Sequence, residues 1–144
     1  MPMEKLGHPP PVVQAMLLAD HIHIDPGTGK RYILGTYNQL MATHFPHAVP
    51  RLCLFVALTE AHGPTMLRLR VVDMDEEMGT LVESAHPAPM YHPNDLYYFS
   101  FTLSVVFPTP GLYRIQLFAD NEFLRELRLQ VGLRPPAGRP LSEE

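Results

Sequence analysis

Apolar and polar residues alternate along several segments of the chain, and turn-forming residues separate those segments at intervals of about ten residues. The clearest segment is Leu96 to Phe107, where every second residue is aromatic or aliphatic and the intervening positions include Ser100, Thr102 and Ser104. Thr65 to Asp73 has the same pattern. A period of two is typical of a β-strand with one buried and one solvated face. We therefore predict a two-layer antiparallel β-sandwich of about seven to nine strands, either immunoglobulin-like or fibronectin-like, with a C2-like or jelly-roll arrangement as the alternative.

One segment is apolar on both of its faces. In Arg51 to Thr59, both alternating sets of side chains are hydrophobic, which predicts a central strand covered on both sides. Cys53, the single cysteine of the chain, lies in this segment. An intrachain disulfide is therefore excluded, and we expect Cys53 to be a small buried side chain rather than a reactive thiol.

Two hairpins are predicted from their turns. Leu112 to Phe118 and Phe123 to Val131 flank Asp120-Asn121, and these two residue types tolerate the positive φ that a two-residue hairpin loop requires. Near the start, Met16 to Ile24 and Arg31 to Tyr37 flank a turn with two glycines, at residues 25–29. Both pairs are expected to be antiparallel.

Pro110-Gly111-Leu112-Tyr113 is typical of the start of a late strand in an immunoglobulin-like sandwich. There, a buried tyrosine donates a hydrogen bond from its hydroxyl to nearby backbone, the arrangement known as a tyrosine corner. We expect Tyr113 to be buried in this way, and its role to be structural.

Clustered prolines predict the irregular parts of the chain. Thr43 to Pro50 and His86 to Asp95 are expected to be loops, because proline cannot donate a backbone hydrogen bond to a neighbouring strand. The predicted organisation is a Pro-rich N-terminal extension at residues 1–11, one β-sandwich domain at residues 12–132 and a Pro-rich tail at residues 133–144.

Composition narrows the choice of partner and compartment. Hydrophobic residues make up 46% of the 144 residues, enough for a folded core, and the formal net charge is −4. The Lys and Arg residues are scattered, so we expect no nucleic-acid partner. The apolar stretch Val12 to Ala19 is too short to span a bilayer and is not followed by a cleavage site, which favours a cytoplasmic protein without membrane insertion.

His21, His23 and Asp25 are the candidate metal ligands. Strand alternation places the two imidazoles and the carboxylate on one face, a geometry found in some β-barrel metal sites. An acidic residue four or five positions after the second histidine is absent, since Gly27 and Thr28 occupy those places. The alternative is that both histidines face solvent while Ile22 and Ile24 face the core.

Two further motifs are candidates for ligand binding. The acidic segment Asp73 to Glu77 could bind calcium at one end of the sandwich if Asp20 with Asp25, or Asn94 with Asp95, supplied a second acidic loop there. An acidic turn is the simpler interpretation. The segment at residues 27–30, Gly-Thr-Gly-Lys, lacks the first glycine and the Ser or Thr of a phosphate-binding loop, so it is interpreted as a turn.

No motif predicts catalysis. The chain has serines and histidines but no nucleophile elbow, so we predict no catalytic residues and no cofactor. Tyr91 and Tyr98 are candidates for an exposed partner surface. The favoured function is a non-enzymatic protein-binding or assembly module, with a protein partner or self-association. The alternatives are a metal- or calcium-binding sandwich and a sugar- or small-ligand-binding domain.

Several turns and strand edges also resemble those of a bacterial family of small β-sandwich proteins known only as a domain of unknown function. The residues that carry this resemblance are Ala19-Asp20 to Asp25, Thr28-Gly29-Lys30, Ile33 to Thr36, Phe45-Pro46, Leu67 to Asp73 and Phe107 to Tyr113. The resemblance covers roughly Val12 to Val131 and implies a bacterial β-sandwich. It implies no substrate and no site residues.

Overall fold

A computed structural model describes residues 8–74 and 79–134 of the chain. The described residues form nine β-strands and no helix. The strands are β1 (Val12–Ile24), β2 (Arg31–Thr36), β3 (Gln39–Ala42), β4 (His47–Thr59), β5 (Gly63–Asp73), β6 (Thr80–Met90), β7 (Leu96–Phe107), β8 (Gly111–Ala119) and β9 (Glu122–Leu133).

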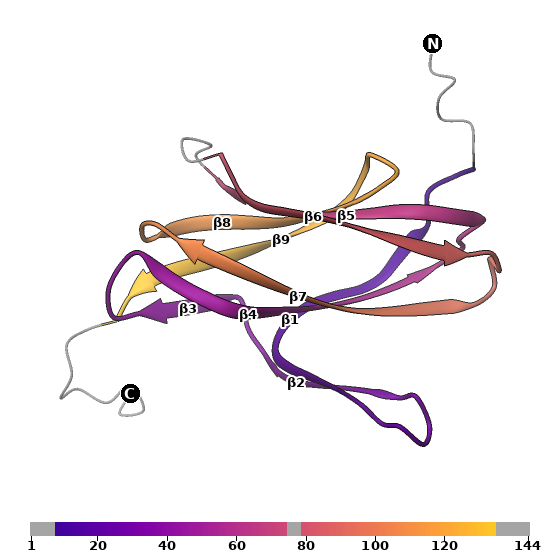
Figure 1. The fold of residues 1–144 in the computed structure, drawn as a ribbon, viewed down its shortest axis with the longest axis horizontal. Coiled ribbons are helices and arrows are strands. Elements are labelled where there is room, and N and C mark those ends of the chain that lie inside the picture. The colour runs from indigo at the N-terminus through magenta and orange to yellow at the C-terminus, as the bar shows by residue number, and fades with distance from the viewer. Residues whose placement is uncertain (1–7, 75–78, 135–144) are drawn as a thin grey trace, which may run out of the picture.

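The strands form two sheets packed face to face (Figure 1). Sheet A has the order β2-β1-β4-β7, and sheet B has the order β3-β9-β8-β5-β6. The pairings are antiparallel, except that β3 runs parallel to β9. The predicted two-layer β-sandwich of seven to nine strands is therefore confirmed.

The core lies between the sheets and follows the predicted alternation. In β5, Leu67, Leu69 and Val71 are buried while Arg68 and Arg70 alternate with them on the other face. In β7 the inward side chains become fully buried from Phe101 onward. As predicted, β4 is a central strand, and its residues 52–58 are all buried.

The C-terminal hairpin also matches its prediction. Strand β8 pairs with β9 about Asp120 and Asn121, whose φ angles are 49° and 70°. Tyr113 is 1% exposed, and its hydroxyl donates a hydrogen bond to the backbone oxygen of Thr109 at 2.6 Å. The tyrosine corner is thus present at the start of β8.

Two segments predicted as loops are partly strands, and those predictions were wrong. Residues 86–90 belong to β6, although Pro87 and Pro89 lie among them. Because β6 is an edge strand, alternate N–H groups point away from β5, and prolines spaced two apart cost no ladder hydrogen bond there. Residues 47–50 begin β4, and Pro50 falls where the pairing with β7 is irregular, between Val49 and Leu52.

The β1–β2 hairpin, predicted from its glycine turn, extends away from the sandwich on the outer side of sheet A (Figure 1). Its base is part of the sheet, because β1 pairs with β4 as far as the pair of Ala19 with Cys53. Beyond that point, β1 pairs with β2 down to Ile24 and Arg31. The Arg31 guanidinium lies 5.3 Å from the ring centre of Tyr98 on β7, so the hairpin folds back over the sheet.

Candidate binding surface

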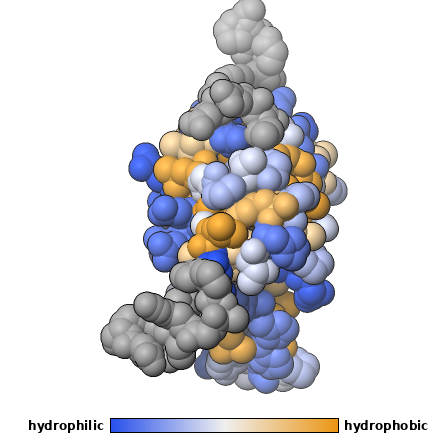
Figure 2. All heavy atoms as spheres, turned by 90° about the vertical axis from the view of Figure 1, so that its left-hand side faces the viewer, coloured by the Kyte–Doolittle hydropathy of each residue, from blue (hydrophilic) through white to orange (hydrophobic). Residues whose placement is uncertain are grey.

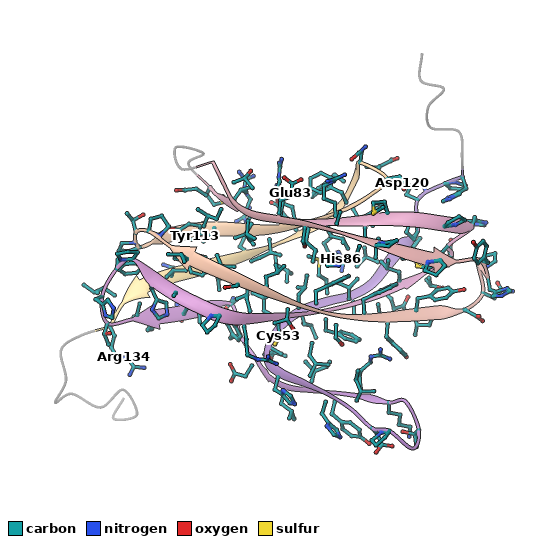
Figure 3. All side chains as sticks on the ribbon, in the orientation of Figure 1. Cys53, Glu83, His86, Tyr113, Asp120 and Arg134 are labelled. Carbon is teal, nitrogen blue, oxygen red and sulfur yellow. The ribbon has the colours of Figure 1, made fainter. Side chains whose placement is uncertain are left out.

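The outer face of sheet A is apolar and partly covered. On β4, Cys53, Phe55 and Ala57 alternate with the core residues and point to this outer face, yet all three are buried. Phe55 stacks on Tyr98 at 5.9 Å between ring centres, and the Arg31 guanidinium lies over the same Tyr98 ring. Figure 3 shows Cys53 on the side of sheet A from which the hairpin extends. The hairpin is therefore a partial third layer over this face.

The hairpin itself has two different faces. Ile22, Ile33 and Arg31 are half-buried and belong to the face turned toward sheet A. The other face, which carries His21, His23, Tyr32 and Leu34, is exposed. The His23 and Tyr32 rings lie 5.9 Å apart on paired positions. This exposed face presents two imidazoles, a phenol and an aliphatic side chain to solvent.

The histidines predicted as metal ligands thus share one exposed face, as strand alternation requires. Asp25 is held by its own turn, because its Oδ2 accepts hydrogen bonds from the Thr28 hydroxyl at 2.7 Å and the Thr28 N–H at 2.9 Å. These hydrogen bonds lower the pKa of Asp25 below its ordinary value, and the bond from the Thr28 hydroxyl has the larger effect. Among residues 8–74 and 79–134, no three His, Cys, Asp or Glu side chains form a group that could hold a metal ion. Metal binding by this hairpin stays a prediction.

A pocket of about 330 Å³ lies where the chain leaves sheet A for sheet B. It is lined by Met16, Leu17, Leu18, Thr36, Tyr37, Asn38, Leu127 and Arg128. Burial, followed by the electrostatic effects of Asp20 and Cys53, raises the pKa of Tyr37 to about 12, so its hydroxyl keeps its proton to a more alkaline pH than that of a free tyrosine. Sequence reasoning missed Tyr37, because nothing local marks it apart from its place at the end of a predicted strand.

The outer face of sheet B differs from that of sheet A in its charge, because oppositely charged side chains on neighbouring strands pair across it. Arg68 lies 3.6 Å from Glu83, and the Arg114 guanidinium lies 3.9 Å from Glu126. Arg70 donates hydrogen bonds to Gln116 at 3.2 and 3.3 Å. These partly exposed pairs give the face a charged and polar surface. Figure 3 places Glu83 on the side of the molecule opposite to Cys53.

The acidic segment predicted to bind calcium lies mostly outside the described residues, because residues 75–78 are not among them. Asp73 ends β5 and is buried beside Tyr113 in the strand register. Asn94 and Asp95 follow β6, whose last residue pairs with the first residue of β5. They therefore lie at the end of the sandwich away from Asp73, and cannot supply a second acidic loop beside it.

Both tyrosines singled out from the sequence are exposed, but they are not equivalent. Tyr91 is 59% exposed in the connection between β6 and β7. Tyr98 is 41% exposed and is held between Phe55 and Arg31. Tyr98 therefore belongs to the outer face of sheet A, whereas Tyr91 lies at one end of the molecule.

The apolar surface is not confined to one place. Figure 2, which views the end of the sandwich facing left in Figure 1, shows apolar patches interspersed with hydrophilic surface. Leu112 and Leu133 are among the exposed apolar residues of the described chain. No helix in residues 8–74 or 79–134 has the length and hydrophobicity to cross a membrane.

Fold and surface together define an all-β protein of two packed sheets whose outer faces differ in charge. The chain belongs to the family of unknown function DUF6941, which it matches over residues 14–132. No curated protein matches it.

Solved structures that resemble the fold include two of a beta-glucosidase from Listeria innocua. One, in complex with isofagomine, has a TM-score of 0.46 and 13% sequence identity, over 74% of this chain and 17% of that chain. The other has a TM-score of 0.45 and 12% identity, over 80% of this chain and 21% of that chain. This chain therefore spans about a fifth of the length of those enzymes.

Proposed function

We propose that this protein is a non-enzymatic protein-binding module that contacts its partner through the outer side of sheet A. The observation that carries the proposal is the contrast between the two outer faces of the sandwich. Sheet B presents the charged pairs of Arg68 with Glu83 and of Arg114 with Glu126 to solvent. The outer side of sheet A presents mainly uncharged side chains, as a surface that is to be covered by protein would.

The exposed apolar side chains support the same choice of surface. Eight of the fourteen large hydrophobic residues that are exposed in the described chain belong to β1, β2 and β7, which are three of the four strands of sheet A. They are Val12, Leu17, Ile24, Tyr32, Leu34, Leu96, Tyr98 and Val106. Tyrosine is enriched at protein interfaces, because its ring gives contact area at little cost in conformational entropy.

Site-specific photo-crosslinking in cells tests the proposal. A photoreactive phenylalanine analogue replaces Leu34 on the exposed hairpin face, and the matched control replaces Ala85, which is exposed on the outer face of sheet B opposite Arg68. We expect discrete protein adducts from position 34 and none above background from position 85. Equal labelling from the two positions, or no adduct from either, would count against this surface.

The topology supports a module built for binding. We propose that the sandwich is immunoglobulin-like, with β1, β4 and β7 as the first, second and fifth strands of that fold and β5, β8 and β9 as its third, sixth and seventh. The tyrosine corner of Tyr113, at the start of β8, occupies the place that it has in such domains. This fold is a common carrier of binding surfaces, and the surface rather than the fold has to define the partner.

A cytoplasmic location is part of the proposal. Cys53 is a free, buried thiol in the structure, which suits a reducing compartment. A fluorescent fusion followed by fractionation checks this location, and recovery of the protein from an oxidising compartment would contradict it.

A further inference from the structure

The four sheet edges of the sandwich are protected to different degrees. Proteins usually blunt an edge strand with proline, charge or short length, since an open edge invites pairing with another chain. In sheet B, β3 has four residues, and β6 contains Glu83, Pro87 and Pro89. In sheet A, β2 has six residues and is broken by Gly35, whose φ is 75°.

Strand β7 has none of these protections. Its twelve residues, Leu-Tyr-Tyr-Phe-Ser-Phe-Thr-Leu-Ser-Val-Val-Phe, include no charge, no proline and no glycine. It is the last strand of sheet A and pairs only with β4 in the described chain. The irregularity in that pairing adds one residue to β4, between Val49 and Leu52, and leaves β7 regular. A long, regular and uncharged edge is a template for an additional strand.

The outer side chains of β7 are arranged symmetrically about Thr102. Tyr98 and Val106, two of the three exposed large apolar residues of the strand, lie four positions before and four positions after it. The third, Leu96, lies outside the symmetric part, because its counterpart at position 108 is beyond the end of β7. Ser100 and Ser104 lie two positions on either side. In an antiparallel pair of two copies centred on Thr102, Tyr98 of each copy meets Val106 of the other, and Ser100 meets Ser104. Aromatic with β-branched pairs are among the favourable cross-strand contacts.

We propose that β7 pairs with β7 of a second copy of this chain, antiparallel about a two-fold axis at Thr102, so that two copies of sheet A join into one continuous sheet. The proposal rests on the proposed function, of which it names one partner. A second copy is the occupant, because the outer residues from Tyr98 to Val106 form matching cross-strand pairs when the opposing strand has the same sequence in the opposite direction. No charged side chain of β7 opposes this pairing, although the chain as a whole carries a net charge of −4.

Sedimentation velocity of the full chain over a range of concentrations tests the pairing. Thr102→Lys places two ammonium groups directly opposite each other across the two-fold axis, and we expect it to weaken dimerisation by at least about tenfold. Gln39→Lys is the matched control, because it adds the same charge to an exposed position on β3, another edge strand. We expect the control to dimerise like the original protein.

Mixing two oppositely charged variants gives a second measurement of dimerisation, which does not depend on a single variant. Thr102→Glu alone should dimerise as weakly as Thr102→Lys, whereas the two variants mixed in equal amounts should form a mixed dimer, since opposite charges then face each other. Circular dichroism verifies that each variant is folded. The proposal is overturned if the original protein stays monomeric at every concentration. It is also overturned if Thr102→Lys does not weaken the dimer, or if the two variants form no mixed dimer.

These results separate the two proposals. A monomeric protein whose hairpin is crosslinked to a different protein at position 34 removes the β7 pairing and retains the binding module. A dimer sensitive to Thr102→Lys, without adducts at position 34, retains the pairing and removes the hairpin face as a docking surface.

Discussion

Gly35 and Asp20 determine how the β1–β2 hairpin leaves sheet A. They lie opposite each other, between the pairs Ala19 with Thr36 and His21 with Leu34. Gly35 has a φ of 75°, a conformation that residues with a Cβ rarely adopt. A Cβ at this position would stand 2.6 Å from Asp20 Oδ2 and 3.2 Å from Asp20 Cβ. Glycine is therefore required here both by the backbone and by the neighbouring side chain.

We predict that Gly35→Ala lowers the free energy of unfolding by about 2–3 kcal/mol, from positive-φ strain and the contact with Asp20. Gly29→Ala is the matched control, since Gly29 has a φ of 76° with nothing within 4 Å of the added Cβ. It should cost only the strain, about 1 kcal/mol. Urea unfolding of both variants measures the difference. Adding Asp20→Ala should recover part of the loss in Gly35→Ala, and equal losses in the two glycine variants would contradict the role of Asp20.

At the scale of single elements, the β8–β9 hairpin is fixed by a turn that also ties it to a third strand. Asp120 Oδ1 accepts a hydrogen bond from the backbone N–H of Met66 on β5 at 2.9 Å, and the Asp120 N–H donates one to the Met66 oxygen at 2.9 Å. The turn is thus docked on the start of β5. Asn121 has the same left-handed conformation, with a φ of 70°.

This arrangement predicts unequal effects of two adjacent alanine substitutions. Both Asp120→Ala and Asn121→Ala place alanine at a positive φ, so both lose about 1 kcal/mol of stability to strain. Only Asp120→Ala also leaves the Met66 N–H without its side-chain partner, for a further loss of about 1 kcal/mol. Thermal melts of the two variants measure the comparison. If Asn121→Ala is the more damaging, the tie to Met66 does not stabilise the hairpin.

An element could be predicted from the sequence when residues close to it in the chain determine it, and could not when distant parts of the fold do. The β8–β9 hairpin was predictable because Asp120 and Asn121 specify the turn themselves. Residues 86–90 of β6 were not, because Pro87 and Pro89 are compatible with a strand only at a sheet edge, and edge position depends on the whole fold. β3 has only four residues, too few for a pattern to emerge.

For the candidate surface, several of its residues could be predicted from the sequence, but the contacts that bring them together could not. Alternation placed His21 and His23 together on one face, and Tyr98 was singled out as exposed. The contact of Arg31 with Tyr98 could not be predicted, because it joins strands β2 and β7, which are not neighbours in sheet A. Nor could the pattern along β4 predict what buries its apolar outer side, where Cys53, Phe55 and Ala57 are buried although no third sheet exists in the described chain.

At the scale of the whole molecule, the hairpin is an addition to a sandwich that is complete without it. Strand β1 uses Val12 to Ala19 to pair with β4, whereas residues 20–24 pair only with β2. We expect this added layer to keep the outer side of β4 buried, because sheet B covers only the inner side of that strand. Cys53 lies on this outer side and is 4% exposed, so the accessibility of its thiol measures how well the outer side of β4 is covered.

Removing the hairpin should therefore uncover Cys53 without unfolding the sandwich. Replacing residues 21–34 with Asn-Gly joins Asp20 to Gly35, which already face each other, through a two-residue turn of the kind that closes hairpins. We expect the β-sheet circular dichroism to persist and native-state labelling of Cys53 by a thiol reagent to become at least about tenfold faster, because a buried thiol is protected from reagents. Cys53→Ala in the same background is the control and should remove the labelling. If the shortened protein keeps the sheet signal but labels no faster than the original, the hairpin does not cover this side of sheet A, and the outer face of β4 must be closed by other means.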